Sequence, residues 1–222
     1  LGGRFGAAGA RVVIEEFMDG EEGSLFALCD GQRAVLFGGA QDHKRAFDGD
    51  LGPNTGGMGS YSPAPVFTPE LVQEADERIV QPTLRAMAAE GAPYRGVLYA
   101  GLMATDGGPK VVEFNARFGD PETQAVLSLL QTPLADVLGA VAYRRLRGIT
   151  LTWKPGYAAT VVLAASGYPA SPRKGDAISG AALDDPQRVL HAGTAHTDGA
   201  YRTAGGRVLS VLGKGSTLGE AR

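Results

Sequence analysis

Glycine divides this chain into short segments more than any other residue does. It accounts for 33 of the 222 residues, roughly twice its ordinary share in globular proteins. The glycines follow no three-residue period, which excludes a collagen-like helix, and they gather at apparent turns and loops. Such a chain is typical of tight turns and of backbone that comes close to ligands. We therefore expect a globular fold of short elements joined by glycine-containing loops.

Short apolar runs bounded by turn residues predict the strands. Residues 11–17 (RVVIEEF) form a β-branched run, and residues 24–29 and 34–37 are expected to pair as a hairpin across Asp30-Gly31. Two longer runs, 96–103 and 110–117, are expected to pair across a turn rich in glycine. Further strands are predicted at residues 158–164 and 188–192, with a hairpin over residues 200–212.

Capping residues and prolines predict where helices begin. Thr68 before Pro69 suits the start of one helix, which Pro82 is expected to kink or divide. Asp120, before Pro121, is interpreted as the N-cap of a second helix in preference to a catalytic residue. A third helix follows Thr132-Pro133, and its apolar face is expected to hold Leu134, Val137, Leu138 and Val141.

Charge and cysteine content exclude several classes of protein. With 21 Lys and Arg against 24 Asp and Glu the formal net charge is −3, so no basic field indicates a nucleic acid partner. No apolar run approaches the roughly 20 residues of a membrane span, so no membrane partner is expected. The single cysteine, Cys29, cannot form an internal disulfide, which is typical of a reducing cytosol. We therefore expect a cytoplasmic protein.

The chain ends and a change of pattern near residue 148 set the expected domain organisation. Both ends fall inside apparent elements, a glycine-rich loop at Leu1 and a starting helix at Arg222, so we expect part of a longer polypeptide. Strands dominate the pattern after residue 148. We place one domain over residues 1–148 and a small β-rich domain over residues 149–222.

Residues 111–117 (VVEFNAR) hold the most informative pattern. Alternate side chains of a strand share a face, so Glu113, Asn115 and Arg117 are expected on one side. Val112, Phe114 and Ala116 would then point into the core. Carboxylate and amide oxygens suit Mg²⁺, and a guanidinium can clamp a phosphate or carboxylate. The spacing alone still favours the solvated face of an antiparallel strand.

Two other segments carry candidate residues with a plain alternative. Carboxylates in residues 14–22 (IEEFMDGEE) could bind adenine and ribose, although an acidic turn is the commoner explanation. Residues 38–65 are polar and predict a long loop, which indicates function. Within it, GPNTGGMG could form an anion-binding nest of backbone N–H groups, although by itself it favours a cluster of turns. No Walker A motif is present.

The run RFGDPETQ, residues 117–124, resembles the signature of the glycinamide ribonucleotide synthetases, the phosphoribosylamine–glycine ligase family. The segments VIEEFMDGEE, AQDHKR, GPNTGGMGSYSPAP, LYAGLM and VVEFNARFGDPETQ resemble this family in order and spacing, over nearly the whole chain. The resemblance implies an α+β fold of the ATP-grasp class. The chain would hold part of the ATP-grasp domain, an antiparallel sheet with helices, followed by a small β-rich domain.

The resemblance also implies an activity in purine biosynthesis. ATP would phosphorylate glycine, and 5-phosphoribosylamine would attack the glycyl phosphate to give glycinamide ribonucleotide, ADP and phosphate. Mg²⁺ or Mn²⁺ would be the cofactor, small molecules the only partners, and a monomer the favoured state. The implied metal ligands are Glu113 and Asn115, the ATP-binding residues are Glu15, Glu16, Phe17, Met18 and Glu22, and the substrate- or phosphate-binding residues are Lys44, Asn54, Thr55, Gly56, Gly57 and Arg117, the last also catalytic.

Departures from the family pattern limit what this chain is expected to do alone. The family's N-terminal substrate-binding domain and the lid of its ATP site would precede Leu1, and its C-terminal domain would continue past Arg222. We therefore expect an incomplete ATP site and little or no ligase activity from the isolated chain. Two alternatives stay open: another ATP-grasp ligase or carboxylase of purine synthesis, and a non-catalytic module that only binds nucleotide or a partner.

Overall fold

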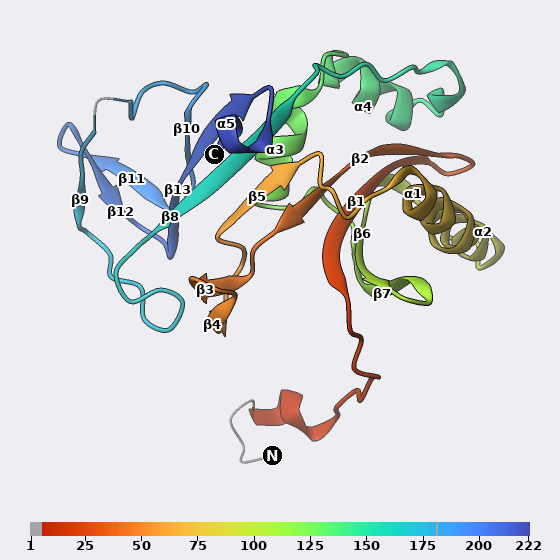
Figure 1. Ribbon diagram of the computed structural model, residues 1–222, viewed down its shortest axis with the longest axis horizontal. Coiled ribbons are helices and arrows are strands. Elements are labelled where there is room, and N and C mark those ends of the chain that lie inside the picture. The colour runs from red at the N-terminus through yellow and green to blue at the C-terminus, as the bar shows by residue number, and fades with distance from the viewer. Residues whose placement is uncertain (1–5, 181) are drawn as a thin grey trace.

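The computed structural model describes residues 6–180 and 182–222 as a mixed arrangement of strands and helices (Figure 1). The strands are β1 (Glu21–Asp30), β2 (Ala34–Asp42), β3 (Arg45–Phe47), β4 (Leu51–Asn54), β5 (Gly59–Ser62), β6 (Arg95–Thr105), β7 (Gly108–Asn115), β8 (Tyr157–Ala164), β9 (Ala177–Ile178), β10 (Val189–His191), β11 (Thr194–Thr197), β12 (Ala200–Thr203) and β13 (Arg207–Gly215). The helices are η1 (Gly6–Ala10), α1 (Pro69–Ala75), η2 (Asp76–Val80), α2 (Gln81–Ala89), α3 (Glu122–Leu129), α4 (Leu134–Ala142), η3 (Leu146–Gly148) and α5 (Leu218–Ala221).

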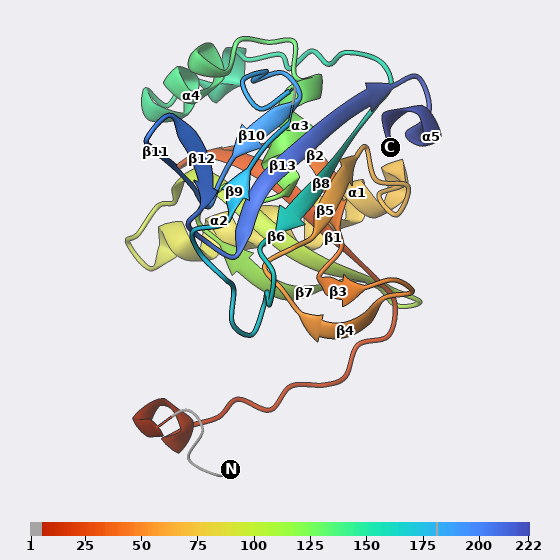
Figure 2. The same ribbon diagram turned by 90° about the vertical axis from the view of Figure 1, so that its left-hand side faces the viewer.

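One antiparallel sheet organises the molecule. Its eight strands lie in the order β10-β13-β8-β5-β2-β1-β6-β7, and every neighbouring pair is antiparallel. A small sheet, β11-β12-β9, lies at one end, at the left of Figure 1 and the front of Figure 2. This mixed architecture confirms the expected α+β class. Because β5 pairs with β8, the large sheet continues across the domain boundary expected near residue 148.

The strand β1 is buried on both faces, which explains its continuous apolar run. Its odd-numbered side chains, such as Leu25, pack with Ile79 on the side of α1, η2 and α2. Its even-numbered side chains, such as Phe26, pack with Val126 of α3 and Val137 of α4 on the other side. The helices therefore cover the middle of the sheet from both faces, which leaves the polar beginning of β1 outside these apolar clusters.

Local signals predicted the first helix and the two hairpins beside it. The Thr68 side chain accepts a hydrogen bond from the N–H of Leu71 at 3.2 Å, as expected of an N-cap. The helix is divided before Pro82 by the π-helical turn η2, since proline lacks the N–H that a regular helix would use there. The expected hairpins β1–β2 and β6–β7 are confirmed.

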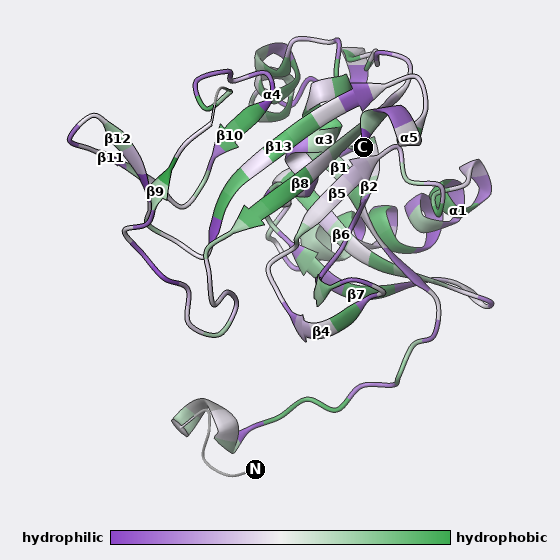
Figure 3. Cartoon of the chain, turned by 60° about the vertical axis from the view of Figure 1, so that its left-hand side comes forward, coloured by the Kyte–Doolittle hydropathy of each residue, from purple (hydrophilic) through white to green (hydrophobic). Residues whose placement is uncertain are grey.

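Four expectations about strands were wrong. Residues 12–19 are extended but belong to no strand of the described chain, because a strand forms only where a neighbour offers its backbone (Figures 1 and 3). The apolar side chains exposed there are those of Val12, Val13, Ile14 and Phe17. The predicted loop 38–65 contains the end of β2 and all of β3, β4 and β5.

Residues 200–212 are not a hairpin, since β12 pairs with β9 and β11 while β13 pairs with β8 and β10. Phe114 and Ala116 are exposed, because β7 is the edge strand of the sheet.

Two expectations about helices were also wrong. Asp120 does not cap α3: the N-cap residue is Pro121, and no side chain bonds to the helix start. The Asp120 carboxylate accepts instead from Gln124 and Arg207. In α4, Val137 and Val141 are buried, but Leu138 is 39% exposed because it lies on the flank of the helix. None of the helices in the described chain is long and apolar enough to cross a membrane.

Candidate functional site

The candidate site lies on the face of the sheet that carries α3 and α4, where β1, β6 and β7 run side by side. In the ladder, Ser24 of β1 is opposite Gly101 of β6, and Gly101 is opposite Glu113 of β7. Asn115 lies two residues further along β7, opposite Tyr99. The Asn115 amide donates a hydrogen bond to Oε1 of Glu113 at 3.0 Å. The expectation that these two side chains share a face is therefore confirmed.

A cation among carboxylates forms the centre of the site. Lys44 follows the end of β2, and its ammonium forms an ion pair with the Glu22 carboxylate of β1. Burial would lower the pKa of Lys44, but its hydrogen bond to Glu22 and the charges of Asp42, Glu22 and Glu113 outweigh burial and raise the pKa. Lys44 is therefore held protonated within electrostatic reach of the metal-ligand candidate Glu113.

Two further acid groups lie close to this ion pair, the buried Glu122 and the partly buried Asp42. Glu122, at the start of α3, is 3% exposed and accepts a hydrogen bond from the Ser24 hydroxyl at 2.9 Å. The same hydroxyl lies 2.7 Å from the Tyr99 phenol oxygen. Burial, and then the charge of Glu122, raises the pKa of Asp42 from 3.8 to about 6. The site therefore holds more negative charge than the sequence motifs alone indicated.

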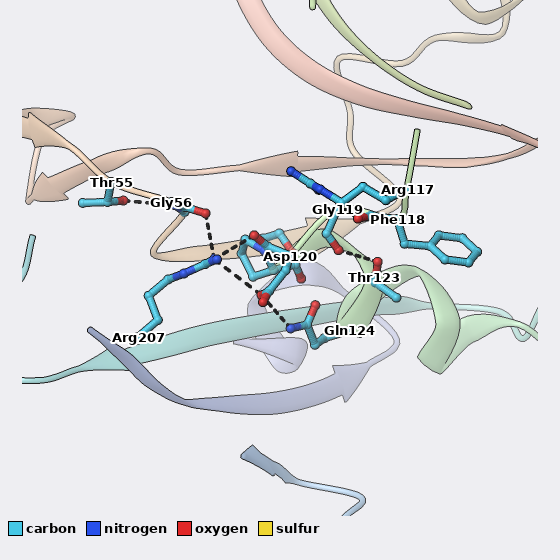
Figure 4. A network of polar contacts seen from close by, with 12 residues as sticks. Thr55, Gly56, Arg117, Phe118, Gly119, Asp120, Thr123, Gln124 and Arg207 are labelled. Atoms are coloured by element: carbon cyan, nitrogen blue, oxygen red, sulfur yellow. Dashed lines mark hydrogen bonds and ion pairs between the residues drawn. The ribbon is translucent and has the colours of Figure 1, made fainter. Parts of the chain in front are cut away.

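The glycine-rich loop, residues 55–58 between β4 and β5, lies against the turn before α3, residues 118–121, as Figure 4 shows. The N–H and hydroxyl of Thr55 both donate to the Lys44 carbonyl, at 2.7 and 2.9 Å. The Gly56 N–H donates to the Tyr168 hydroxyl, and the Gly57 N–H donates to the Thr55 hydroxyl. These amides already have partners within the protein. The loop is thus fixed in place rather than offering the open nest that its glycines suggested.

Arg207 joins this loop to the turn. Its Nη1 donates to the Gly56 carbonyl and to the Asp120 carbonyl, both at 2.7 Å, and lies 3.4 Å from the Asp120 carboxylate (Figure 4). The Arg117 guanidinium is turned toward its own segment, where it donates to the Phe118 carbonyl at 2.9 Å. Arg117 lies two residues past Asn115, the last residue of β7, and so it stands between the predicted metal ligands and the turn before α3.

The predicted adenine-binding segment is only partly joined to the site. Glu22 lies in β1 and pairs with Lys44. Glu16 forms an exposed ion pair with Lys110 of β7 at 2.7 Å, so the extended segment runs close to the edge strand. Glu15 and Phe17 are exposed and Met18 is partly buried.

Oxygen donors of the right kind for a hard divalent cation are present on β7. A carboxylate and an amide two residues apart on one strand face can supply two protein oxygens, the usual number for Mg²⁺ in a phosphate site. Groups of three or more His, Cys, Asp or Glu side chains suited to a metal are absent from the described residues. The donor set on β7 therefore suits an ion whose other ligands come from water and phosphate.

Sequence reasoning missed four residues of this site. They are Asp42, Glu122, Tyr168 and Arg207. Asp42 and Glu122 stand inside quoted motifs, so their position in AQDHKR and RFGDPETQ was the available signal. Tyr168 and Arg207 lie in the β-rich part of the chain, where no motif drew attention to them, and only the folded sheet brings them to the loop.

The comparisons with known proteins match both parts of the chain to one family. Residues 1–123 match the family model "Phosphoribosylglycinamide synthetase, ATP-grasp (A) domain", and residues 158–222 match the corresponding C domain. The chain is 57% identical over 226 residues to the phosphoribosylamine–glycine ligase of Phenylobacterium zucineum, covering all of this chain and 53% of the relative. It is 58% identical over 226 residues to the enzyme of the same name from Caulobacter vibrioides, with the same coverage.

Solved structures extend the comparison. The crystal structure of phosphoribosylamine–glycine ligase from Thermotoga maritima superimposes with a TM-score of 0.84 at 40% identity, over 93% of this chain and 51% of that one. The urea carboxylase of Kluyveromyces lactis superimposes with a TM-score of 0.61 at 14% identity, over 90% of this chain and 17% of that one, a likeness of fold alone. The chain spans about half the length of the curated relatives it matches.

Proposed function

The chain belongs to the phosphoribosylglycinamide synthetase family, and on that premise we propose that it forms about half of a phosphoribosylamine–glycine ligase of purine biosynthesis. In the proposed reaction, ATP transfers its γ-phosphoryl group to a carboxylate oxygen of glycine, which gives glycyl phosphate and ADP. The amine nitrogen of 5-phosphoribosylamine then attacks the acyl carbon and loses a proton. The C–O bond to phosphate breaks as the amide bond forms, and glycinamide ribonucleotide and inorganic phosphate result.

One observation carries this proposal. Three separate motif resemblances pick out Glu22, Lys44, Glu113 and Asn115, and these residues gather at one site: Lys44 pairs with Glu22 and feels the charge of Glu113, which bonds to Asn115. Phosphoryl transfer depends on positioning and on offsetting the charge of the phosphates, for which a fixed cation and metal-binding oxygens are suited. A merely solvated strand face would not need a half-buried ammonium that pairs with Glu22 and lies within the field of Asp42 and Glu113.

Roles for the remaining residues follow from their chemistry. Glu113 and Asn115 would hold Mg²⁺ or Mn²⁺, which when bound would offset charge on the phosphates of ATP. Lys44 and Arg117 would bind phosphate or carboxylate groups of the substrates, with Arg117 able to use two parallel N–H donors after it turns from its present partner. Residues 15–18 and Glu22 would bind the nucleoside, and residues 54–57 would line the substrate side.

The isolated chain is proposed to have little or no ligase activity. It spans about half of its relatives, and the segment proposed to bind adenine has no strand partner among the described residues. A monomer with small-molecule partners, and without nucleic acid or membrane partners, remains our expectation, as does a cytoplasmic location.

Isothermal titration of MgATP into the 222-residue chain is the first test. We expect weak binding that needs Mg²⁺ and is lost in Glu113→Gln. The matched control is Glu90→Gln, an exposed acid after α2, which should bind as the parent chain does. Equal binding by both variants would remove Glu113 from the metal site.

A chimera tests the activity itself. The half of the Phenylobacterium zucineum ligase that this chain does not match is joined to the complete chain, in place of the region that is 57% identical. We expect ADP release that depends on both glycine and phosphoribosylamine, and no such release from the chain alone. A well-folded chimera that consumes ATP without a requirement for glycine would refute the proposed substrate and favour another ATP-grasp ligase.

A further inference from the structure

Residues 158–222, which match the C-domain model, contact the glycine-rich loop of the candidate site. Neither the family match nor the motifs assign a role to this contact. Two of their side chains hold a single residue of the glycine-rich loop, Gly56, by the peptide units on either side of it. Tyr168 accepts a hydrogen bond from the Gly56 N–H at 2.9 Å, and Arg207 donates to the Gly56 carbonyl at 2.7 Å. The peptide unit before Gly56 is therefore held at its N–H, and the peptide unit after Gly56 at its carbonyl.

The same guanidinium nitrogen reaches a second segment. Arg207 also donates to the Asp120 carbonyl at 2.7 Å, and the Asp120 carboxylate lies 3.4 Å away. The Arg207 side chain is only 25% exposed, so these bonds compete less with water than those of a free surface arginine. A charged donor shared by two backbone carbonyls fixes the distance between the loop and the turn before α3.

The packing around this contact leaves little room for other arrangements. A Cβ atom added at Gly57 would lie 2.5 Å from Cδ of Pro121, and one at Gly206 would lie 2.4 Å from Cδ2 of Tyr168. The loop therefore rests directly on the turn, and the Tyr168 ring rests directly on the backbone beside Arg207. Glycine is required at both positions because the atoms that would meet a side chain are part of rings or backbone.

The contact continues to the ionic centre of the site. Gly56 follows Thr55, whose N–H and hydroxyl both bond to the Lys44 carbonyl. The Lys44 ammonium in turn pairs with Glu22. A displacement of Gly56 would thus be passed on to the backbone of the lysine proposed to bind substrate.

We propose that Arg207 and Tyr168 are positioning residues, through which the C-terminal part of the chain holds the glycine-rich loop and Lys44 in the arrangement that binds the anionic substrates. The proposal rests on the proposed function for the identity of those substrates. Neither residue touches the reacting groups. Their role is to set the loop against the Asp120 turn, and the result is a substrate site completed by residues that lie outside the ATP-grasp match.

Hydrogen–deuterium exchange of the 222-residue chain tests the positioning without relying on activity. In Arg207→Met, the N–H groups of Thr55 and Met58 are expected to exchange at least tenfold faster, while those of β1 and β6 keep the parent rates. Arg207→Lys, which keeps the charge and one donor nitrogen, should exchange at rates between those of the parent and of Arg207→Met. Arg202→Met is the control, since among the described residues this arginine bonds through its side chain to the Gly175 carbonyl and not to the glycine-rich loop. Unchanged exchange in Arg207→Met and in Tyr168→Phe would overturn the proposal.

Steady-state kinetics of the chimera separate positioning from mere stability. We expect the KM for glycine or phosphoribosylamine to rise at least fivefold in Arg207→Met and Tyr168→Phe, with the KM for ATP within twofold of the parent and partial rescue by Arg207→Lys. Faster exchange with unchanged KM values would overturn the substrate role. An inactive parent chimera would refute the proposed function, while the exchange experiment would still test the loop contact. Should Arg207→Met not fold, Arg207→Lys and Tyr168→Phe carry both measurements.

Discussion

Replacing Asp42 with asparagine is expected to remove a pH dependence of stability that this carboxyl group gives to the fold. Asp42 ends β2, and it is partly buried close to Glu122 and Glu22. Burial is the largest cause of its raised pKa, followed by the charge of Glu122, while Lys44 acts in the opposite direction. Asparagine has nearly the same shape but never carries the charge.

The sign of this pH dependence follows from the number of protons that the folded and the unfolded state bind. Between pH 4 and pH 6 the unfolded chain has largely lost the Asp42 proton while the folded chain keeps it, since the folded pKa is about 6 against 3.8. The folded state then binds more protons, so stability is fully present below pH 4 and falls as the pH rises through 6. A shift of about two units corresponds to at most about 3 kcal/mol, which partial contact with water reduces to about 1–2 kcal/mol.

The measurement is urea unfolding followed by the fluorescence of Trp153, the single tryptophan, at several pH values between 4 and 7.5. Asp42→Asn should match the parent near pH 4 and exceed it by about 1–2 kcal/mol at pH 7. Asp106→Asn, in the exposed turn after β6, is the control and should follow the parent throughout. A constant difference between Asp42→Asn and the parent at every pH would refute the reasoning.

Three further predictions concern the fold. Phe26 is fully buried, with its ring centroid 5.2 Å from that of Tyr99, so Phe26→Ala should lower the free energy of unfolding in urea by about 3–5 kcal/mol. A similar loss of stability in Phe114→Ala, at the exposed edge of the sheet, would contradict this account of the core. Burial raises the pKa of the Cys29 thiol to about 12, so a thiol reagent at pH 8 should label Cys29 only after the chain unfolds. Rapid labelling of the folded chain would show that Cys29 is not buried in the core. Gly139 lies inside α4 with open space at its Cβ position, so Gly139→Ala should stabilise the chain by up to about 1 kcal/mol, and a lowered Tm would count against it.

Much of the local structure could be predicted because its causes lie within a few residues. The hairpins β1–β2 and β6–β7 join neighbouring runs across glycine turns, and Thr68 caps its helix with its own side chain. Alternation along β7 also placed Glu113 and Asn115 on one face. These features need no information about the rest of the chain.

Errors arose where a distant segment decides the outcome. The run 11–17 has the composition of a strand but lacks a neighbour among the described residues. Residues 38–65 carry weak strand signals, and the extended conformation there comes from pairing with β2 and β8. Asp120 has the sequence context of an N-cap, yet the carbonyl and carboxylate it offers are taken by Arg207, 87 positions away.

The sequence by itself determined the family, the class of fold and the shared face of Glu113 and Asn115 on β7, because motif order and side-chain alternation are properties of the chain. The tertiary structure decided which charges share the site. Arg207 meets Gly56 across 151 positions, and Glu122 reaches Ser24 across 98. Such contacts depend on the order of strands in the sheet and on which helix covers which face, and no local preference of the residues involved specifies that order.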